Sequence, residues 1–174
     1  VEWSFYPTTL LAQGDSCIGG KSSINFKQYK NQLGNFYPPK KIYIDTEFLK
    51  TLDNNAIRSG LGEMMHFFVL NSESDFKMFL KNYYRSLSDI NILKKLIFRS
   101  LHIKKAMVEI DEFDKNERQI FNYGHSFGHA IETITNYKVP HGIAVCHGMD
   151  IANYISGKLG IVESGFREKV KELL

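Results

Sequence analysis

Histidines in the second half of the chain have a spacing that suits metal binding. His125 and His129 lie four residues apart in a segment of helical pattern, so both side chains should point to one face of a helix. Two imidazoles placed in this way can hold one metal ion. Ser126 stands where a zinc peptidase has its glutamate, so a peptidase would lack its general base. The alternative is a pair of histidines at the surface or the edge of the core.

A carboxylate in an apolar helix could complete this site. Glu63 lies in the run Gly60–His66, and an ionised carboxylate in a protein core is costly unless a cation or a metal pairs with it. A place on the wet face of the helix, or in an ion pair, is the alternative. His141 follows a proline and precedes a glycine, and we expect it on a loop that can aim its side chain at a site. Two histidines and Glu63 would match the ligand set of a catalytic zinc with one open position.

Two further groups could bind anions. Gly19-Gly20-Lys21 follows Asp15, and glycines let the backbone approach an anion while the lysine adds charge. An ordinary turn is the alternative, and the spacing is not that of a Walker A loop. Arg118, Asn122 and His125 are spaced four and three, which predicts that they share a helix. There they could grip a phosphorylated acid, or they could form a solvated helix start.

The elements that position these residues form a short α/β piece and then a helical body. Glycine and proline pairs punctuate the chain as far as about Lys50, and residues 41–45 predict a short strand. Thr46 or Asp53 could cap the helix that follows. Apolar residues then recur three and four apart, which predicts helices over 57–68, 76–83, 93–103 and 120–135, and another from about 143 to Gly160. The sequence therefore predicts a mainly α fold.

Composition excludes several classes of function. The 174 residues are 43% hydrophobic and 24% charged, which is ordinary for a globular protein, and the net charge of +3 gives no case for a nucleic-acid partner. Apolar stretches stay below the roughly 18 residues of a membrane span. The first residues carry no signal-peptide pattern and read like a cut within a longer protein. Cys17 and Cys146 make no disulfide framework, which favours a reduced, cytoplasmic setting.

Two long segments match the signatures of a known family. The stretch from Pro7 to Lys21 reads PTTLLAQGDSCIGGK, and residues 122–132 read NYGHSFGHAIE. Lys30-Asn31 and His141-Gly142 follow at fitting distances. In this order the motifs resemble PTxLLAQxDSSxGGK and NFGHTFGHAIE of the 3-dehydroquinate synthase family, which belongs to the sugar-phosphate cyclases. The similarity runs over roughly residues 7 to 150.

The resemblance implies a division of the chain and a role for each site residue. Residues 1–50 would be the end of an NAD-binding α/β domain with the substrate loop, and residues 51–174 a C-terminally incomplete helical domain. A catalytic Zn²⁺, or another divalent metal, would be bound by Glu63, His125 and His141, and His129 would contact the substrate phosphate instead. The other implied pocket residues are Asp15, Lys21, Asn31, Lys104, Arg118 and Asn122, with Lys104 and Arg118 on a carboxylate. The implied NAD contacts are Thr8, Lys30, Phe48 and Thr51.

The implied activity is that of a phosphate-eliminating cyclase, a carbon–oxygen lyase of the shikimate pathway of aromatic amino acid biosynthesis. It would convert 3-deoxy-arabino-heptulosonate 7-phosphate, a small phosphorylated acid, to 3-dehydroquinate with NAD and zinc, in a cytoplasmic homodimer. His66 departs from the family's lysine, and Asp114 from its glutamate. The family's glycine-rich nucleotide-binding turn and a C-terminal lysine are not in this sequence, so we expect the chain by itself to be inactive.

Three alternatives remain at this point. A sister cyclase acting on another sugar phosphate is indicated by His66, although Lys104 and Arg118 suit a carboxylate. A non-catalytic relative could keep a structural metal. An iron- or zinc-dependent alcohol dehydrogenase shares the broad architecture, but the long match over residues 122–132 argues against it.

Overall fold

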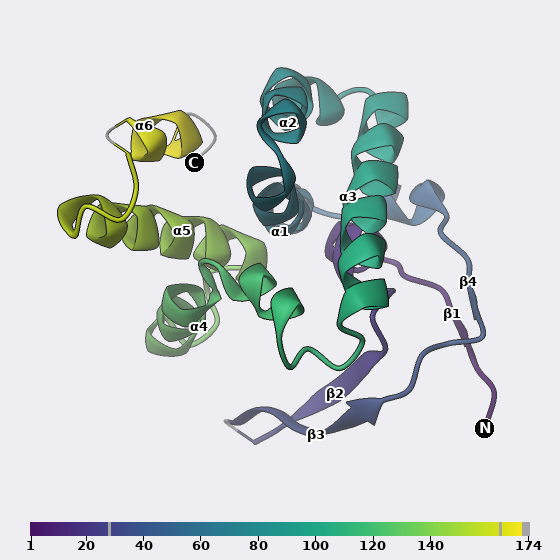
Figure 1. Ribbon diagram of the computed structural model, residues 1–174. Helices are drawn as coiled ribbons and strands as arrows, with labels where there is room; N and C mark the ends of the chain where they lie inside the picture. The colour runs from purple at the N-terminus through teal and green to yellow at the C-terminus, as the bar shows by residue number, and fades with distance from the viewer. Residues whose placement is uncertain (28, 164, 172–174) are drawn as a thin grey trace.

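Helices make up most of the computed structural model (Figure 1). It describes residues 1–27, 29–163 and 165–171, without the side chains of residues 25, 29 and 30. The strands are β1 (Ser4–Phe5), β2 (Lys21–Phe26), β3 (Tyr29–Phe36) and β4 (Lys41–Ile42). The helices are α1 (Asn54–Asn71), α2 (Glu73–Ser86), α3 (Ile90–Ile110), α4 (His125–Ile134), α5 (His141–Lys158) and α6 (Phe166–Lys171). Short helical turns cover Ala12–Ser16, Thr46–Thr51 and Glu117–Asn122. The predicted mainly α fold is confirmed.

Side-chain caps begin the first three helices. The Asp53 carboxylate accepts a hydrogen bond from the backbone N–H of Ala56 at 2.7 Å, and Ser72 and Asp89 cap α2 and α3 in the same way. Each cap satisfies an amide that has no partner within its helix. Of the two residues expected to cap a helix, Asp53 therefore begins α1, whereas Thr46 is buried within the turn that Asp45 caps.

Helix α1 lies at the centre of the core. Every residue from 59 to 68 is buried, because α2, α3 and α5 pack around this helix. Its apolar side chains join those of the neighbouring helices in one cluster, which includes Leu61, Met64, Phe68, Phe79 and Leu96. This surrounding places Glu63 and His66, the polar residues of the same stretch, in the interior of the protein.

A β-hairpin stands apart from the helices. Strands β2 and β3 pair antiparallel, with Lys21 opposite Phe36, and Figure 1 shows them below the helical body. The ring of Phe36 meets Phe113 at 5.4 Å between centroids, and Lys21 forms an ion pair with Asp114. These contacts attach the base of the hairpin to the loop that follows α3.

Two predicted elements differ from the structure. The helix expected over 120–135 is interrupted, since a 3-10 turn ends at Asn122, Gly124 has a φ of 81°, and α4 begins at His125. A β-carbon on Gly124 would collide with the Met149 side chain, so a glycine is needed there. His141, expected on a loop, is the first residue of α5 and follows Pro140 at the N-cap.

Two smaller expectations can be compared directly. The strand predicted over 41–45 reaches only from Lys41 to Ile42, where it pairs parallel with β1. Cys17 and Cys146 are both free thiols. Among the described residues, no helix has the length and apolar character needed to cross a membrane.

Candidate metal centre

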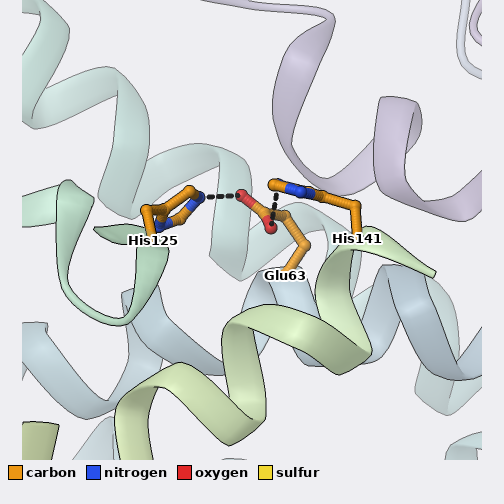
Figure 2. A group of neighbouring side chains, drawn as sticks. All are labelled: Glu63, His125 and His141. Atoms are coloured by element: carbon orange, nitrogen blue, oxygen red, sulfur yellow. Dashed lines mark ion pairs between the residues drawn. The ribbon is translucent and has the colours of Figure 1, made fainter. Parts of the chain in front are cut away.

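Three helices bring one carboxylate and two imidazoles together (Figure 2). Glu63 comes from the middle of α1, while His125 and His141 are the first residues of α4 and α5. Nε2 of His125 lies 3.5 Å from Oε1 of Glu63, and Nε2 of His141 lies 3.3 Å from Oε2. One ligand atom from each residue lies within 4.8 Å of the others, so the three could hold one metal ion. Carboxylate and imidazole donors are those that zinc prefers.

The electrostatics of the cluster also suit a divalent cation. Burial raises the pKa of Glu63, but the neighbouring His125, His141 and His66 outweigh it and hold the pKa well below its usual range. The carboxylate is therefore ionised in the interior. Its Oε2 receives no well-aligned hydrogen bond from the described residues, although Nε2 of His141 is close. An anionic oxygen and two imidazole nitrogens that converge in this way fit a metal.

The orientation of His125 supports the same reading. Its Nδ1 lies 3.3 Å from the carbonyl oxygen of Tyr123. A proton on Nδ1 would be donated to this carbonyl, which leaves the lone pair on Nε2 directed towards Glu63. Metal-binding histidines are commonly oriented by such a hydrogen bond on the far nitrogen.

Glycines set the distances between the three helices. The backbone N–H of Gly142 donates to Oγ of Ser59 at 2.9 Å, and a β-carbon on Gly142 would collide with the Ser59 carbonyl. A β-carbon on Gly148 would meet the carbonyl of Gly124 in the same way. The helix backbones can therefore approach closely, and this brings Glu63 within reach of the histidines.

A second group adjoins the first through His141. Nδ1 of His141 lies 3.1 Å from Oε2 of the buried Glu132, and ligand atoms of His129, Glu132 and His141 also lie within 4.8 Å of one another. Burial lowers the pKa of His141, but Glu63 and Glu132 outweigh it, so the pKa is raised overall. His125 and His129, expected on one helix face, thus belong to adjoining groups.

Sequence reasoning missed Glu132. The signal was available, because Glu132 lies seven residues after His125, two helical turns along the same face. It is also an acid in an amphipathic helix, and the cost of burying a carboxylate, applied above to Glu63, applies to it equally.

His66 lies beside the cluster without adding charge to it. It is fully buried, its ring packs against Phe67 and Phe121, and its Nδ1 is 3.9 Å from Oε1 of Glu63. Among the described residues, Nδ1 has no hydrogen-bond partner. Burial lowers the pKa of His66 to about 4, so the imidazole is neutral at neutral pH.

A cavity of about 1020 Å³ opens onto the cluster. Glu63, His125 and His141 line it. It is also lined by all seven residues for which the family resemblance implies a role in substrate binding or catalysis, namely Asp15, Lys21, Asn31, Lys104, Arg118, Asn122 and His129. The break at Gly124 moves Arg118 and Asn122 off the helix of His125, yet all three face the same space.

Cations form part of the cavity wall. Nζ of the buried Lys104 lies 2.7 Å from Oδ1 of Asp15, and Nη1 of the buried Arg118 donates to the carbonyl of Gly19 at 3.2 Å. Lys21 follows in the same glycine turn and pairs with Asp114. The glycine turn and the helical region thus meet at one point, where three cations stand beside the carboxylates of Asp15 and Asp114.

The predicted NAD contacts are not gathered in this cavity. Thr8, Phe48 and Thr51 are exposed and do not line it, and Oγ1 of Thr51 donates to the carbonyl of Phe48 at 3.1 Å. The side chain of Lys30, the fourth, lies outside the described residues.

Comparison with known proteins assigns both parts of the chain to one family. The protein-family model described as 3-dehydroquinate synthase N-terminal matches residues 1–59. The family model described as 3-dehydroquinate synthase C-terminal matches residues 60–174. The 3-dehydroquinate synthase of Dictyoglomus thermophilum is 43% identical over 170 residues, covering 97% of this chain and 48% of the relative. That of Campylobacter concisus is 42% identical over 169 residues, with the same coverage. The chain spans about half the length of these relatives.

Solved structures share the fold. A 2-epi-5-epi-valiolone synthase from Streptomyces hygroscopicus, with NAD⁺ and Zn²⁺ bound, is 24% identical with a TM-score of 0.88, over 99% of this chain and 49% of that one. A 2-deoxy-scyllo-inosose synthase complexed with carbaglucose-6-phosphate, NAD⁺ and Co²⁺ is 25% identical with a TM-score of 0.86, over 100% and 48%.

Proposed function

Because the chain belongs to the 3-dehydroquinate synthase family, we propose that it forms the metal- and substrate-binding part of a 3-dehydroquinate synthase. The whole enzyme would be a lyase that converts 3-deoxy-arabino-heptulosonate 7-phosphate to 3-dehydroquinate with loss of phosphate. The observation that carries the proposal is the convergence of Glu63, His125 and His141 in a cavity that also holds buried Lys104 and Arg118.

The proposed metal ligands are Glu63, His125 and His141. When bound there, zinc or another divalent metal would polarise a substrate oxygen. The buried carboxylate supplies the negative charge, and the carbonyl of Tyr123 orients the ring of His125. His129 would contact the substrate phosphate, since it lines the same cavity one helical turn after His125.

The proposed substrate class is a phosphorylated acid. Lys104 and Arg118 are both buried, so their charges act in a poorly solvated wall where attraction to an anion is stronger than in water. We assign them to the carboxylate of the substrate. The remaining polar groups of the cavity would hold its phosphate and hydroxyls, and these are Asp15, Lys21, Asn31 and Asn122.

NAD would supply the redox chemistry of the reaction. Thr8, Lys30, Phe48 and Thr51 are proposed to lie along it, and the exposure of Thr8, Phe48 and Thr51 is compatible with contact to a cofactor at the surface. In this division, residues 1–50 end the NAD-binding domain and residues 51–174 form the helical domain. We further propose that the enzyme is a cytoplasmic homodimer.

A sister cyclase is the second candidate, and His66 favours it. This neutral side chain stands in the cavity wall where the family usually has a lysine, so the site carries one positive charge fewer. The solved 2-deoxy-scyllo-inosose synthase was complexed with carbaglucose-6-phosphate, a ligand without a carboxylate. A substrate of that kind would leave Lys104 and Arg118 without their proposed partner.

Phosphate release from two substrates distinguishes the candidates. The full-length protein is supplied with NAD, zinc and either the seven-carbon keto-acid phosphate or a seven-carbon sugar phosphate that lacks the carboxylate. The proposal expects phosphate and 3-dehydroquinate, identified by mass spectrometry, from the keto acid. Preference for the sugar phosphate would favour the sister cyclase, and release from neither would contradict both.

A further inference from the structure

His141 lies between two buried carboxylates. Its Nε2 is 3.3 Å from Oε2 of Glu63, and its Nδ1 is 3.1 Å from Oε2 of Glu132. Glu63 is 3% exposed and Glu132 4%. A neutral imidazole carries one N–H, so the nitrogen that offers a lone pair to a metal requires the proton to be on the other one. If Nε2 offers its lone pair to a metal, Nδ1 therefore carries the proton and requires a hydrogen-bond acceptor.

We propose that Glu132 is a positioning residue for the metal centre. Its carboxylate accepts a hydrogen bond from Nδ1–H of His141, which fixes the tautomer and the angle of the ring, with the Nε2 lone pair turned towards Glu63. The inference rests on the proposed metal site and adds a residue outside its ligand set. Carboxylates in this role also increase the basicity of the histidine they hold.

The packing of α4 on α5 explains why Glu132 reaches His141. These two helices make close contact, since a β-carbon on Gly128 would press on the backbone of Val145 and one on Gly148 on that of Gly124. His125 and Glu132 are separated by two turns of α4, so the same face presents a metal ligand at one end and the carboxylate near the other. The buried carboxylate needs a donor, and Nδ1 of His141 supplies one.

A cation held by His129, Glu132 and His141 is the competing explanation. Their ligand atoms lie within 4.8 Å of one another, but such a cation would use Nδ1 of His141. If Nε2 of the same ring held the metal beside Glu63, the ring would have to lose its last proton. The proposal therefore expects one metal ion per chain and an intact Nδ1–H.

Two substitutions separate the hydrogen bond from the bulk of the side chain. Glu132→Gln keeps an oxygen that can accept from Nδ1–H, whereas Glu132→Leu removes the acceptor and keeps a similar volume. Zinc affinity of the full-length protein is measured by competition with a coloured chelator, and circular dichroism verifies folding. We expect Glu132→Leu to bind zinc about 10–100-fold more weakly and Glu132→Gln to fall between it and wild type. Glu109→Gln is the matched control, because Glu109 is exposed on α3 and pairs with Lys105.

The tautomer gives a readout that a merely structural role would not change. In zinc-loaded protein with ¹⁵N-labelled histidine, NMR should find the proton of His141 on Nδ1, and Glu132→Leu should weaken its protection from exchange. Unchanged zinc affinity and an unchanged Nδ1 signal in folded Glu132→Leu would overturn the inference alone. Two metal ions in wild type, the second lost in Glu132→Gln, would establish the competing cation site instead. Wild type without zinc affinity would overturn the proposed metal site and the inference together.

Discussion

Arg118→Ala should selectively weaken the use of a substrate that carries a carboxylate. Arg118 is 3% exposed, and its Nη1 donates to the carbonyls of Gly19 at 3.2 Å and Glu112 at 2.7 Å. These two bonds hold the guanidinium against the glycine turn at the cavity. Arg118 lines the cavity, and a guanidinium matches a planar carboxylate in shape and charge.

The size of the effect follows from the kind of bond that is lost. A hydrogen bond to a charged group contributes about 1.5–3 kcal/mol. If the lost hydrogen bonding to the substrate carboxylate contributes about 2 kcal/mol, kcat/KM for the keto-acid phosphate should fall by about 30-fold. Arg118→Ala also removes the bonds to Gly19 and Glu112, but this damage affects every substrate and cancels in the ratio of two kcat/KM values.

The assay compares kcat/KM for the keto-acid phosphate and for the sugar phosphate that lacks the carboxylate, in full-length wild type and variant. We expect the ratio of the two values to change by about 30-fold in Arg118→Ala. Lys115→Ala is the control, because Lys115 is an exposed cation in the same segment. Equal losses on both substrates would refute the assignment of Arg118 to the carboxylate.

Four further predictions address the metal, the substrate, stability and the chain alone. Elemental analysis should find that His141→Ala loses zinc while His129→Ala keeps it. His66→Lys adds a cation to the cavity wall and should raise kcat/KM for the keto acid relative to the neutral sugar phosphate. The Arg99 guanidinium beside Asp75 lowers the pKa of that carboxyl from 3.8 to about 2, so denaturant unfolding should find stability present above pH 3.8 and lost as pH falls towards 2, a loss reduced in Asp75→Asn. The 174-residue chain by itself should bind zinc but should not release phosphate repeatedly. Adding the part of a relative that this chain does not cover should restore repeated release.

Each of these has a contradicting outcome. Stoichiometric zinc in His141→Ala would remove His141 from the ligand set. An unchanged ratio of kcat/KM for the two substrates in His66→Lys would mean that the charge at this position does not affect substrate preference. A pH profile identical in Asp75→Asn would place the acid sensitivity elsewhere. Multiple turnovers by the chain alone would mean that it contains a complete cofactor site.

The helices were largely predictable, because their apolar residues recur with helical period and are buried in the structure. Ile57, Leu61, Met64 and Phe68 lie on α1 as the spacing predicts. The hairpin of β2 and β3 was not predicted, since its strands expose apolar and polar residues alike and carry no clean alternation. The break at Gly124 was not predicted either, because the apolar period continues through it, whereas in the structure Gly124 has a φ of 81° and packs against α5.

The candidate site was also predictable from the sequence only in part. Glu63 could be singled out from the sequence because it is a carboxylate in an otherwise apolar helix. The helical spacing drew attention to His125 and His129. Spacing alone paired those two histidines as ligands, whereas in the structure Glu63 meets His125 and His141. The partner from α5 could not be found from helical period, because it lies on another helix. Its position between Pro140 and Gly142 indicated only that it could be aimed at a site, and the family resemblance named it as a ligand.

The placement of the cluster depends on backbone contacts more than on the side chains that form it. Glu63 and His141 are separated by most of the helical body in sequence, yet Gly142 bonds to Ser59 one turn before Glu63 on α1. The same α5 meets α4 through Gly148 and Gly124, next to His125. Since α5 contacts both other helices at glycines beside the proposed ligands, a shift of α5 would change both the Glu63–His141 and the His141–Glu132 distances. The position of helix α5 therefore sets the geometry of the proposed metal centre, and its first residue is the proposed ligand that lies between two carboxylates.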